Sequence, residues 1–419
     1  CIIASFCKAV GIDLEILESI LRKEISKEID LNLRVARRVF QEGKELTKIE
    51  PLTQKRLPLL SGNQAISLGL IRGGLKAYIA YPMTPSSPVL HFLADVAQDF
   101  NLKVIHPESE IGVILMALGF SYMGEKVAVG TSGGGFCLMT EGLSFAGMSE
   151  LPVVIILGQR PGPSTGLPTY SAQTDLHFAL NAGQGEFIRF VVAPGDCEEA
   201  YFWSCAAMNI SWKYQIPSII LSDKNLGEGV FNFDIDSIET IKEEGRISWD
   251  RKSPYKRYLN TENGISPLAF VPDKEAIIKV NSYEHDESGI TTEDPVITKT
   301  MQDKRLRKAG YLLKELVTST TKRVAIIASG DMSHGLTTDA PAGYSASGVE
   351  FDKKIQEYLA TNNLTGMLSM DKKFVSDASE CGFRSILILM GALKNMQYTY
   401  KQHAYEGPFG VGYLTANFV

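Results

Sequence analysis

Two segments of the chain carry side chains that suit acid–base chemistry and anion binding. Residues 106–110, HPESE, place two carboxylates at the expected start of a helix, where the helix dipole stabilises negative charge. Residues 158–169 form a long loop with Arg160 at its base and hydroxyls at Thr165 and Thr169. Because a guanidinium binds a carboxylate through two parallel hydrogen bonds, this loop suits a substrate that carries a carboxylate. Each segment alone also fits a structural role, as a stabilised helix start and as a rigid surface loop.

Two further segments have the composition of ligand-binding turns. In residues 81–87, YPMTPSS, two prolines fix the loop and leave the Thr84 hydroxyl, with Ser86 and Ser87 at a helix start, as donors. Residues 131–135, TSGGG, could cradle a phosphate with backbone N–H groups, but the Walker lysine and the GxGxxG spacing are missing. The three glycines are therefore interpreted as a tight turn from a strand into a helix.

These segments follow short apolar runs in a pattern of alternating strands and helices. The predicted strands cover residues 77–80, 104–106, 127–130, 153–157, 188–192 and 218–221, and the predicted helices cover 86–100, 109–123, 136–149 and 196–214. Short buried strands separated by helices indicate a parallel α/β sheet. Such sheets bind ligands at the carboxyl ends of their strands, which is where the segments above lie.

The flanking regions predict further domains. Residues 1–58 contain two helices, within 13–45, that have too little around them for a core, and residues 59–230 form the sheet domain. Residues 231–318 are expected to be an irregular arm that ends in a charged helix near 298–317. Residues 322–419 are expected to form a second, smaller and partial α/β domain, which begins with a strand over 323–328 and ends with a buried apolar run over 408–418.

Composition limits the classes of function. With 42 Lys and Arg against 48 Asp and Glu, the net charge is -6, so no nucleic acid and no membrane partner is expected. The six cysteines form no CxxC pair, which argues against an iron–sulfur cluster held by this chain and favours a reducing, cytoplasmic location. Because the chain starts at Cys1 without a methionine, we expect a fragment that lacks its natural N-terminus.

Five motifs in order resemble one protein family. They are YPMTPSS at 81–87, PESEIG at 107–112, TSGGGFCLMTE at 131–141, ELPVVIILGQRPGPSTGLPT at 150–169 and YEHDESGITTE at 283–293. Residues 62–301 thereby resemble the α subunit of 2-oxoacid:ferredoxin oxidoreductases of the 2-oxoglutarate type. The resemblance implies the pyrimidine-side domain of a thiamine pyrophosphate enzyme. The helices at 13–45 are similar to the tail of the γ domain that precedes α in fused members.

The resemblance implies roles for individual residues. Glu110 matches the glutamate that hydrogen-bonds N1′ of the cofactor, and Tyr81 and Pro82 match cofactor-binding positions. Arg160 matches the anchor of the substrate carboxylate, and hydroxyl partners match at three positions, Thr84, Thr165 and Thr169. The implied reaction is oxidative decarboxylation of a 2-oxoacid, with acyl transfer to coenzyme A and electron transfer to ferredoxin.

Part of the implied machinery has no counterpart in the sequence. A GDG-type motif for Mg²⁺ and diphosphate is missing, because Gly330-Asp331 continues as Met332-Ser333. The resemblance therefore implies a β subunit that carries the diphosphate and Mg²⁺ site together with a [4Fe-4S] cluster. Activity is expected only in the hetero-oligomer.

The last hundred residues resemble a different family. The segments ASGDMSHG at 328–335, GVEFD at 348–352, ASECGF at 378–383 and YEGPFGVGY at 405–413 resemble the second half of the class III extradiol ring-cleavage dioxygenase fold, in the subgroup that includes Memo-like proteins. This implies His334 as acid/base and Glu380, or Cys381 in the Memo-like pattern, as a ligand of Fe²⁺. The two ligand histidines of that fold have no equivalent before residue 322. A dioxygenase-like fusion, a non-catalytic assembly module and a chimeric join all stay open as alternatives.

Overall fold

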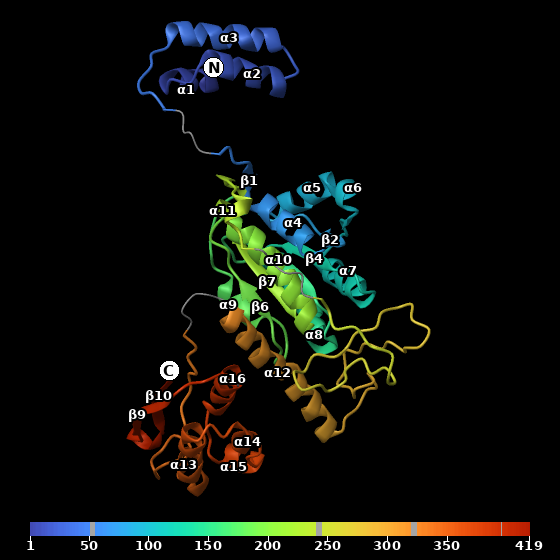
Figure 1. The fold of residues 1–419 in the computed structure, drawn as a ribbon, viewed down its shortest axis with the longest axis vertical. Coiled ribbons are helices and arrows are strands. Elements are labelled where there is room, and N and C mark those ends of the chain that lie inside the picture. Colours follow the sequence, from blue (N-terminus) through green and yellow to red (C-terminus); the bar gives the residue numbers. More distant parts are fainter. Residues whose placement is uncertain (51–54, 240–244, 320–324, 395) are drawn as a thin grey trace. The chain divides into compact units, whose positions relative to one another are not determined.

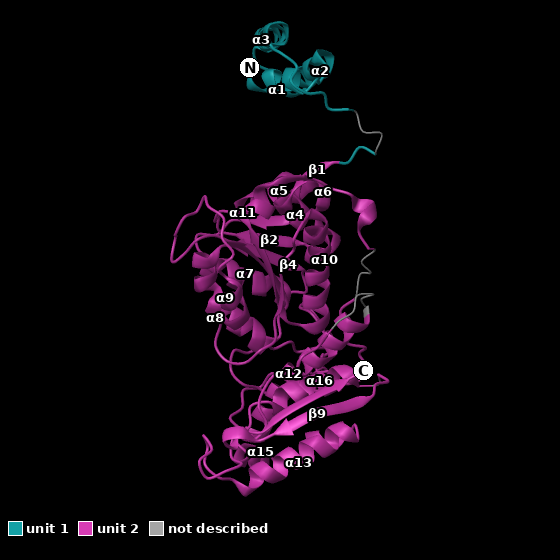
Figure 2. Ribbon diagram, turned by 90° about the vertical axis from the view of Figure 1, so that its left-hand side faces the viewer, with its two compact units in different colours: residues 1–57 teal, residues 58–419 magenta. Residues whose placement is uncertain are grey.

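The computed structural model describes residues 1–50, 55–239, 245–319, 325–394 and 396–419 (Figure 1). The chain divides into two compact units, residues 1–57 and 58–419, which are coloured separately in Figure 2. The second unit contains the three regions that the sequence predicts as separate domains from residue 59 onward. The boundaries at 230 and 318 inside this unit stay predictions.

The first unit consists of helices α1 (Ile2–Ala9), α2 (Leu14–Glu24) and α3 (Ile29–Glu42). The two helices predicted within 13–45 are confirmed. The expectation that they lack a core is wrong, because α1 packs Ala4 and Cys7 against Leu17 and Ala36 to form a small one.

A six-stranded sheet forms the centre of the second unit. Its order is β3-β2-β4-β5-β7-β6, and every pairing in it is parallel. The strands are β2 (Ala77–Ala80), β3 (Lys103–Ile105), β4 (Val127–Thr131), β5 (Val153–Gln159), β6 (Phe190–Val192) and β7 (Pro217–Asp223). All six predicted strands are confirmed, with small shifts at their ends.

Helices cover both faces of this sheet (Figure 1). Side chains alternate along each strand, so Tyr78 and Ala80 join one buried cluster while Ala77 and Ile79 join the other. The first cluster is completed by α4 (Gly62–Arg72), α5 (Ser87–Asp95) and α10 (Cys197–Tyr214), and the second by α7 (Glu110–Tyr122), α8 (Gly133–Ser149) and α9 (Leu176–Asn181). The short helices α6 (Ala97–Phe100) and α11 (Lys224–Glu228) follow α5 and β7.

The predicted arm is mostly irregular. It begins at β8 (Val230–Asn232), which pairs antiparallel with β1 (Leu59–Ser61), and continues through the short 3-10 helix η1 (Ile235–Ser237). It ends in α12 (Pro295–Ser319), which starts before and ends after the predicted 298–317.

A buried ion cluster fixes α12 to the sheet domain. Glu150 lies just after α8, and its Oε1 accepts a hydrogen bond from Lys304 Nζ at 2.7 Å. Lys308 Nζ pairs with Oε2 of the same carboxylate, and all three side chains are at most 1% exposed. Arg257 donates to the backbone carbonyls of residues 149 and 150. One carboxylate thus compensates two buried ammonium groups beside a guanidinium.

The C-terminal segment combines helices with an antiparallel hairpin. The elements are α13 (Ala346–Ala360), α14 (Leu364–Leu368), α15 (Lys372–Asp377), α16 (Phe383–Leu393), β9 (Tyr400–Glu406), the 3-10 helix η2 (Pro408–Gly410) and β10 (Tyr413–Phe418). Met332, Phe351 and Ile355 are among the side chains at its core.

Two sequence expectations for this segment are wrong. The predicted strand over 323–328 is irregular where it is described, from residue 325, and Ile327 is 84% exposed. The run 408–418 is buried only at 410–412, because β10 alternates exposed and half-buried positions along one edge of the hairpin. The α/β class of the segment rests on its helices and its small antiparallel sheet.

Candidate active site

The topology brings the ligand-binding turns together. The strands β3 and β4 lie on opposite sides of β2, so the order of the sheet reverses at β2. In parallel α/β sheets, ligands bind outside the carboxyl ends of the strands at such a reversal. The turns that leave these ends contain the predicted residues: the 81–87 loop follows β2, Glu110 follows β3, the glycine turn follows β4 and the Arg160 loop follows β5.

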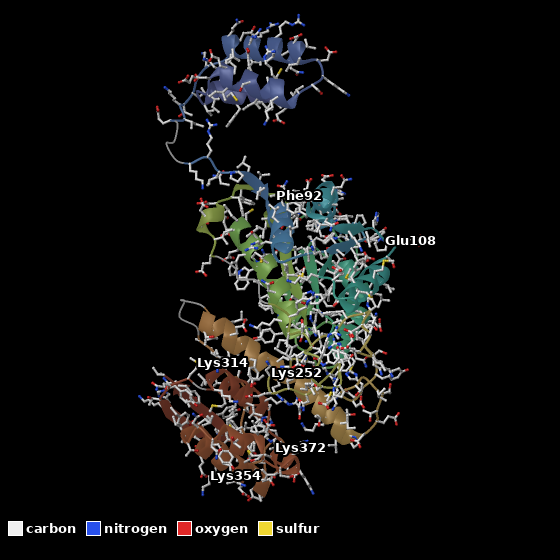
Figure 3. All side chains as sticks on the ribbon, turned by 45° about the vertical axis from the view of Figure 1, so that its right-hand side comes forward. Phe92, Glu108, Lys252, Lys314, Lys354 and Lys372 are labelled. Carbon is white, nitrogen blue, oxygen red and sulfur yellow. The ribbon has the colours of Figure 1, made fainter. Side chains whose placement is uncertain are left out.

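Glu110 is the first residue of α7 and is only 4% exposed. The helix is capped by Ser109, whose Oγ accepts a hydrogen bond from Gly112 N at 3.4 Å, so the Glu110 side chain is not needed as a cap. The Oε1 atom of Glu110 is buried and finds no hydrogen-bond partner in the described part of the chain. A buried carboxylate oxygen without a donor is costly, and it is typical of a position that a ligand completes. Glu108, in contrast, is exposed (Figure 3).

The glycine turn makes room for groups from three other elements. A β-carbon at position 135 would lie 2.2 Å from Thr131 Oγ1 and 2.6 Å from Glu110 Oε1. At position 133 it would lie 3.2 Å from Asp175 Oδ1, and at position 134 it would lie 3.4 Å from the carbonyl oxygen of Ser164. The interpretation of these glycines as a tight turn alone is therefore incomplete. They let Glu110 and the Arg160 loop approach the start of α8.

Three side chains hold the 81–87 loop by its successive carbonyls. Ser86 Oγ donates to Met83 O at 2.8 Å, Arg160 Nη1 donates to Thr84 O at 2.8 Å, and Asn63 Nδ2 donates to Pro85 O at 3.1 Å. Ser86 thus bonds the loop backbone, and it makes no side-chain cap on α5. Arg160 thus contacts the Thr84 backbone, and the roles of the Arg160 guanidinium and the Thr84 hydroxyl in substrate binding stay predictions.

The other predicted residues differ in their exposure. Arg160 is 7% exposed, and its buried Nε has no partner among the described residues, so this N–H is available to a ligand. Thr165 and Thr169 both lie on the exposed part of the loop. Tyr81 is 39% exposed and meets the His106 ring edge-on at 5.9 Å, and Pro82 is half-buried. Substrate binding by Arg160, Thr165 and Thr169 and cofactor binding by Tyr81 and Pro82 stay predictions.

Sequence reasoning missed the polar residues that close the Arg160 loop. Gln159 Oε1, at the end of β5, accepts from Asp175 N at 3.1 Å, and Gln173 Nε2 donates to Asp223 Oδ2 at 2.6 Å. Burial raises the pKa of the Asp175 carboxyl, whose buried Oδ2 has no partner within the described ranges. Gln159 and Asp223 are polar residues at the ends of buried strands. This position in the sequence could have identified them as site residues.

The C-terminal segment gathers three metal-binding side chains. One ligand atom each from Asp331, His334 and Cys381 lies within 4.8 Å of the others. The distance from His334 Nε2 to Asp331 Oδ2 is 3.4 Å, and Asp331 N donates to Cys381 Sγ at 3.1 Å. The Glu380 carboxylate instead accepts from Phe383 N at 2.6 Å, at the start of α16. Asp331 is therefore the carboxylate beside Cys381, and the ligand role of Glu380 stays a prediction.

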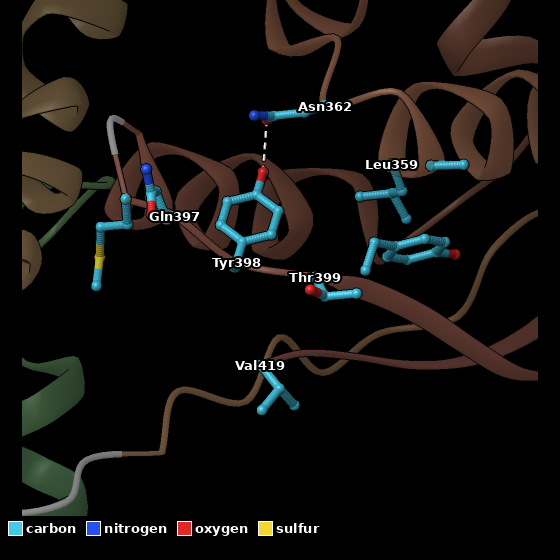
Figure 4. A pocket seen from close by; sticks show the side chains of 9 residues that line it. Leu359, Asn362, Gln397, Tyr398, Thr399 and Val419 are labelled. Atoms are coloured by element: carbon cyan, nitrogen blue, oxygen red, sulfur yellow. Dashed lines mark hydrogen bonds between the residues drawn. The ribbon is translucent and has the colours of Figure 1, made fainter.

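A cavity of about 560 Å³ lies in the C-terminal segment. Figure 4 shows the hydrogen bond from Tyr398 to Asn362 at its wall, and Leu359 and Thr399 also line it. Its lining includes none of the predicted site residues, so the candidate active site is the polar cluster at the strand ends.

The fold and the cluster define a class of protein, namely a parallel α/β domain with a buried polar site at the carboxyl ends of its strands. A family model described as pyruvate flavodoxin/ferredoxin oxidoreductase, thiamine diphosphate-binding, matches residues 68–303, more than half of the chain. The chain belongs to this family. A second model, described as the catalytic LigB subunit of aromatic ring-opening dioxygenase, matches residues 291–416. This second match starts within the predicted arm, earlier than the expected residue 322.

Relatives with curated names agree with the family. The α subunit of 2-oxoacid:ferredoxin oxidoreductase 1 of Sulfurisphaera tokodaii is 35% identical over 328 residues, which are 74% of this chain and 52% of the relative. The 2-oxoglutarate synthase subunit KorA of Archaeoglobus fulgidus is 33% identical over 54% of this chain and 66% of the relative. The chain thus spans about half the length of the first of these relatives.

A solved structure shares the fold. The 2-oxoglutarate:ferredoxin oxidoreductase from Magnetococcus marinus, with 2-oxoglutarate, coenzyme A and succinyl-CoA bound, matches with a TM-score of 0.67 and 29% identity. The match covers 78% of this chain and 59% of that chain. Among the helices that the structure describes, none combines the length and the apolar character needed to cross a membrane.

Proposed function

We propose that this chain is the α-type part of a 2-oxoacid:ferredoxin oxidoreductase. The proposed reaction is oxidative decarboxylation of a 2-oxoacid, with 2-oxoglutarate favoured, to an acyl-CoA with electrons passed to ferredoxin. Membership of the family, the names of the relatives and the 2-oxoglutarate and coenzyme A named for the solved structure support this function. The proposed location is the cytoplasm.

The observation that carries the proposal is the environment of Glu110. Its buried Oε1 has no partner in the described residues and lies beside the space left by Gly135. This fits a cofactor that brings a ring nitrogen to the carboxylate. When bound, thiamine diphosphate supplies the electron sink for loss of carbon dioxide. Glu110 would hold a proton at N1′ of the pyrimidine, and Tyr81 and Pro82 would flank the ring.

Arg160 supplies the second half of the proposal. Its Nη1 is committed to Thr84 O, while its buried Nε points to no described acceptor. A guanidinium placed in this way would anchor the carboxylate of the 2-oxoacid. The hydroxyls of Thr84, Thr165 and Thr169 would add hydrogen bonds once the substrate is present.

The proposed complex needs a β subunit. That subunit would bind the diphosphate and Mg²⁺ and would hold a [4Fe-4S] cluster, since no GDG-type motif and no CxxC pair occur in the sequence. Ferredoxin would be the electron acceptor and coenzyme A the acyl acceptor. This chain would contribute the pyrimidine side of the cofactor site.

The test is co-expression of the chain with a β subunit of this type. The complex should reduce a viologen dye with 2-oxoglutarate only when thiamine diphosphate and coenzyme A are present. Glu110→Gln should abolish this reduction, and Glu108→Gln, which changes an exposed carboxylate two residues away, should leave it intact. Equal turnover of the Glu110→Gln complex and the unchanged complex would remove Glu110 from the mechanism.

A second candidate function is metal binding in the C-terminal segment, which the LigB match and the cluster of Asp331, His334 and Cys381 favour. Oxygen, nitrogen and sulfur donors together suit Fe²⁺ or another transition metal. If other residues hold the metal ion, His334 would be the acid/base of the dioxygenase-like segment. Anaerobic loading with Fe²⁺ should give one bound ion per chain, and Cys381→Ser should lower this occupancy. Absence of bound iron in the unchanged chain would contradict this second function.

A further inference from the structure

The Arg160 loop covers residues 160–175, between the end of β5 and the start of α9. Residues 162–167 at its tip are exposed, and Tyr170 is 64% exposed. Exposed loops of this kind are mobile unless contacts with rigid elements hold them. The contacts that hold this loop therefore decide where its side chains lie.

The carboxylate of Asp223 holds the far end of the loop. Asp223 is the last residue of the fully buried strand β7 and is 8% exposed. Its Oδ2 accepts a hydrogen bond from Gln173 Nε2 at 2.6 Å, and its Oδ1 accepts from Leu226 N at 2.9 Å, which caps α11. Gln173 lies on an exposed part of the loop. One buried carboxylate thus ties an exposed side chain of the loop to the sheet.

The capped helix α11 links this carboxylate to the 81–87 loop. A β-carbon at Gly227 on α11 would lie 3.0 Å from Asn63 Nδ2 on α4. The same Nδ2 atom donates to Pro85 O in the 81–87 loop. Arg160 joins the two loops directly, through its hydrogen bond to the backbone. The two loops that carry the predicted substrate-binding residues are therefore joined twice, at Arg160 and through the carboxylate at the end of β7.

We propose that the hydrogen bond between Gln173 and Asp223 is a latch that holds the Arg160 loop in its substrate-binding arrangement, with Asp223 as the positioning residue. This inference rests on the proposed function, in which the loop supplies the guanidinium and two threonine hydroxyls that bind a 2-oxoacid. When the latch opens, part of the population has a displaced loop. The affinity for the substrate then falls in proportion to the fraction that stays latched.

The variant Asp223→Asn removes the latch selectively. The asparagine keeps an oxygen for the α11 cap, but it places an NH₂ group against Gln173 Nε2, so that two donors face each other. Adding Gln173→Glu to this variant restores a donor–acceptor pair with reversed polarity. Asp371→Asn is the matched control, since Asp371 caps α15 in the C-terminal segment in the same way.

Steady-state kinetics of the complex with the β subunit give the first readout. Asp223→Asn should raise the KM for 2-oxoglutarate about tenfold and keep kcat within about twofold, because saturating substrate restores the latched loop. The double variant should return the KM to within about threefold of the unchanged chain, and Asp371→Asn should not alter it. A merely structural role would lower the yield of active complex and leave the KM unchanged. An unchanged KM, or a raised KM that Gln173→Glu fails to reverse, would overturn the latch.

Limited proteolysis of the full chain gives a second readout that needs no activity. Tyr170 is exposed in the loop, so chymotrypsin should cleave after it whenever the loop is released. Asp223→Asn should speed this cleavage about fivefold or more, while the double variant and Asp371→Asn should be cleaved at the rate of the unchanged chain. Mass spectrometry identifies the fragments. Equal cleavage rates in all four chains would overturn the proposal.

The two readouts separate the latch from the proposed function. A complex that reduces no dye with any 2-oxoacid would contradict the proposed function. Cleavage after Tyr170 that still follows the latch variants would then support the latch by itself. Faster cleavage of Asp223→Asn in a complex with an unchanged KM would overturn the role of Asp223 in positioning the substrate-binding loop.

Discussion

Glu110 and Gly135 lie so close together, on the neighbouring helices α7 and α8, that a β-carbon at position 135 would stand 2.6 Å from the carboxylate oxygen. The glycine therefore determines where the buried carboxylate sits. A substitution at position 135 consequently tests the placement of Glu110 without changing the carboxylate itself.

Gly135→Ala should displace Glu110 and abolish thiamine diphosphate-dependent dye reduction by the complex. The added methyl group overlaps Thr131 Oγ1 as well, and overpacking of this kind costs about 1–3 kcal/mol of unfolding free energy. Gly310→Ala is the control, since a β-carbon there meets nothing within 4 Å, and alanine in a helix should stabilise by up to about 1 kcal/mol. Urea denaturation and the dye assay check both variants. Full activity of Gly135→Ala would show that Glu110 has room to move.

Arg160→Lys should raise the KM for the 2-oxoacid about 10- to 150-fold with a smaller effect on kcat. The reason is that lysine lacks the planar guanidinium, whose paired N–H groups bind a carboxylate. This range corresponds to the roughly 1.5–3 kcal/mol of a hydrogen bond to a charged group. Arg384→Lys serves as control, since Arg384 is an exposed partner of Glu186. Steady-state kinetics separate KM from kcat. A loss confined to kcat would contradict a role in carboxylate binding.

Glu150→Gln should destabilise the fold by about 3–5 kcal/mol, the usual cost of leaving a buried charge uncompensated. The variant removes the carboxylate that pairs with the ammonium groups of Lys304 and Lys308. Glu141→Gln, an exposed change on α8, the helix that precedes Glu150, should alter stability by less than about 0.5 kcal/mol. Chemical denaturation at pH 7 measures both, and similar stability of the two variants would contradict the importance of the cluster.

The same cluster should make stability rise with pH above neutrality. Burial lowers the pKa of Lys304 to about 7 from an ordinary 10.5, although Glu150 opposes the shift. Between these two values the unfolded chain binds a proton that the folded chain does not, so a higher pH favours folding by up to about 1.4 kcal/mol per pH unit. Burial raises the pKa of Glu150, but Lys304 and Lys308 outweigh it and hold that pKa well below its usual range, so Glu150 stays charged throughout.

Lys304→Met isolates this contribution. The difference in unfolding free energy between the unchanged chain and this variant should grow in favour of the unchanged chain from pH 7 to pH 10. Urea denaturation at several pH values in this interval gives the difference. A difference that is independent of pH would show that Lys304 keeps its proton in the folded state.

The sequence was informative where burial leaves a pattern along the chain. The strands at 77–80 and 153–159 are fully buried, so their short apolar runs predicted them, and position after a strand singled out residues 106–110 and the loop 158–169. The apolar residues near Ile327 carry the same signal, yet the described residues 325–328 form no strand, and β9 and β10 pair with each other. A strand needs a neighbour, which local composition does not specify.

The rest of the site depends on contacts that are distant in sequence. Asp175 joins the site because its loop returns to Gln159, sixteen residues earlier. Gly135 matters because it has no side chain, so Glu110 and Thr131 occupy the space that a β-carbon would fill. The sequence does not show which residues occupy that space. The sequence shows that α7 is rich in apolar residues, but it does not show which of them are exposed. That depends on which side of the helix packs against the sheet.

The glycine turn has a consequence for the range of sequences that this fold accepts. The distance from a β-carbon to its nearest neighbouring atom would be 2.2 Å at position 135, 3.2 Å at position 133 and 3.4 Å at position 134. The value at position 134 is an ordinary van der Waals contact. In a saturation library over these three positions, selection for folded, active complex should keep glycine alone at 135 and admit small residues first at 134. The side chains accepted at each of the three positions would then show how closely the surrounding residues pack against the start of α8.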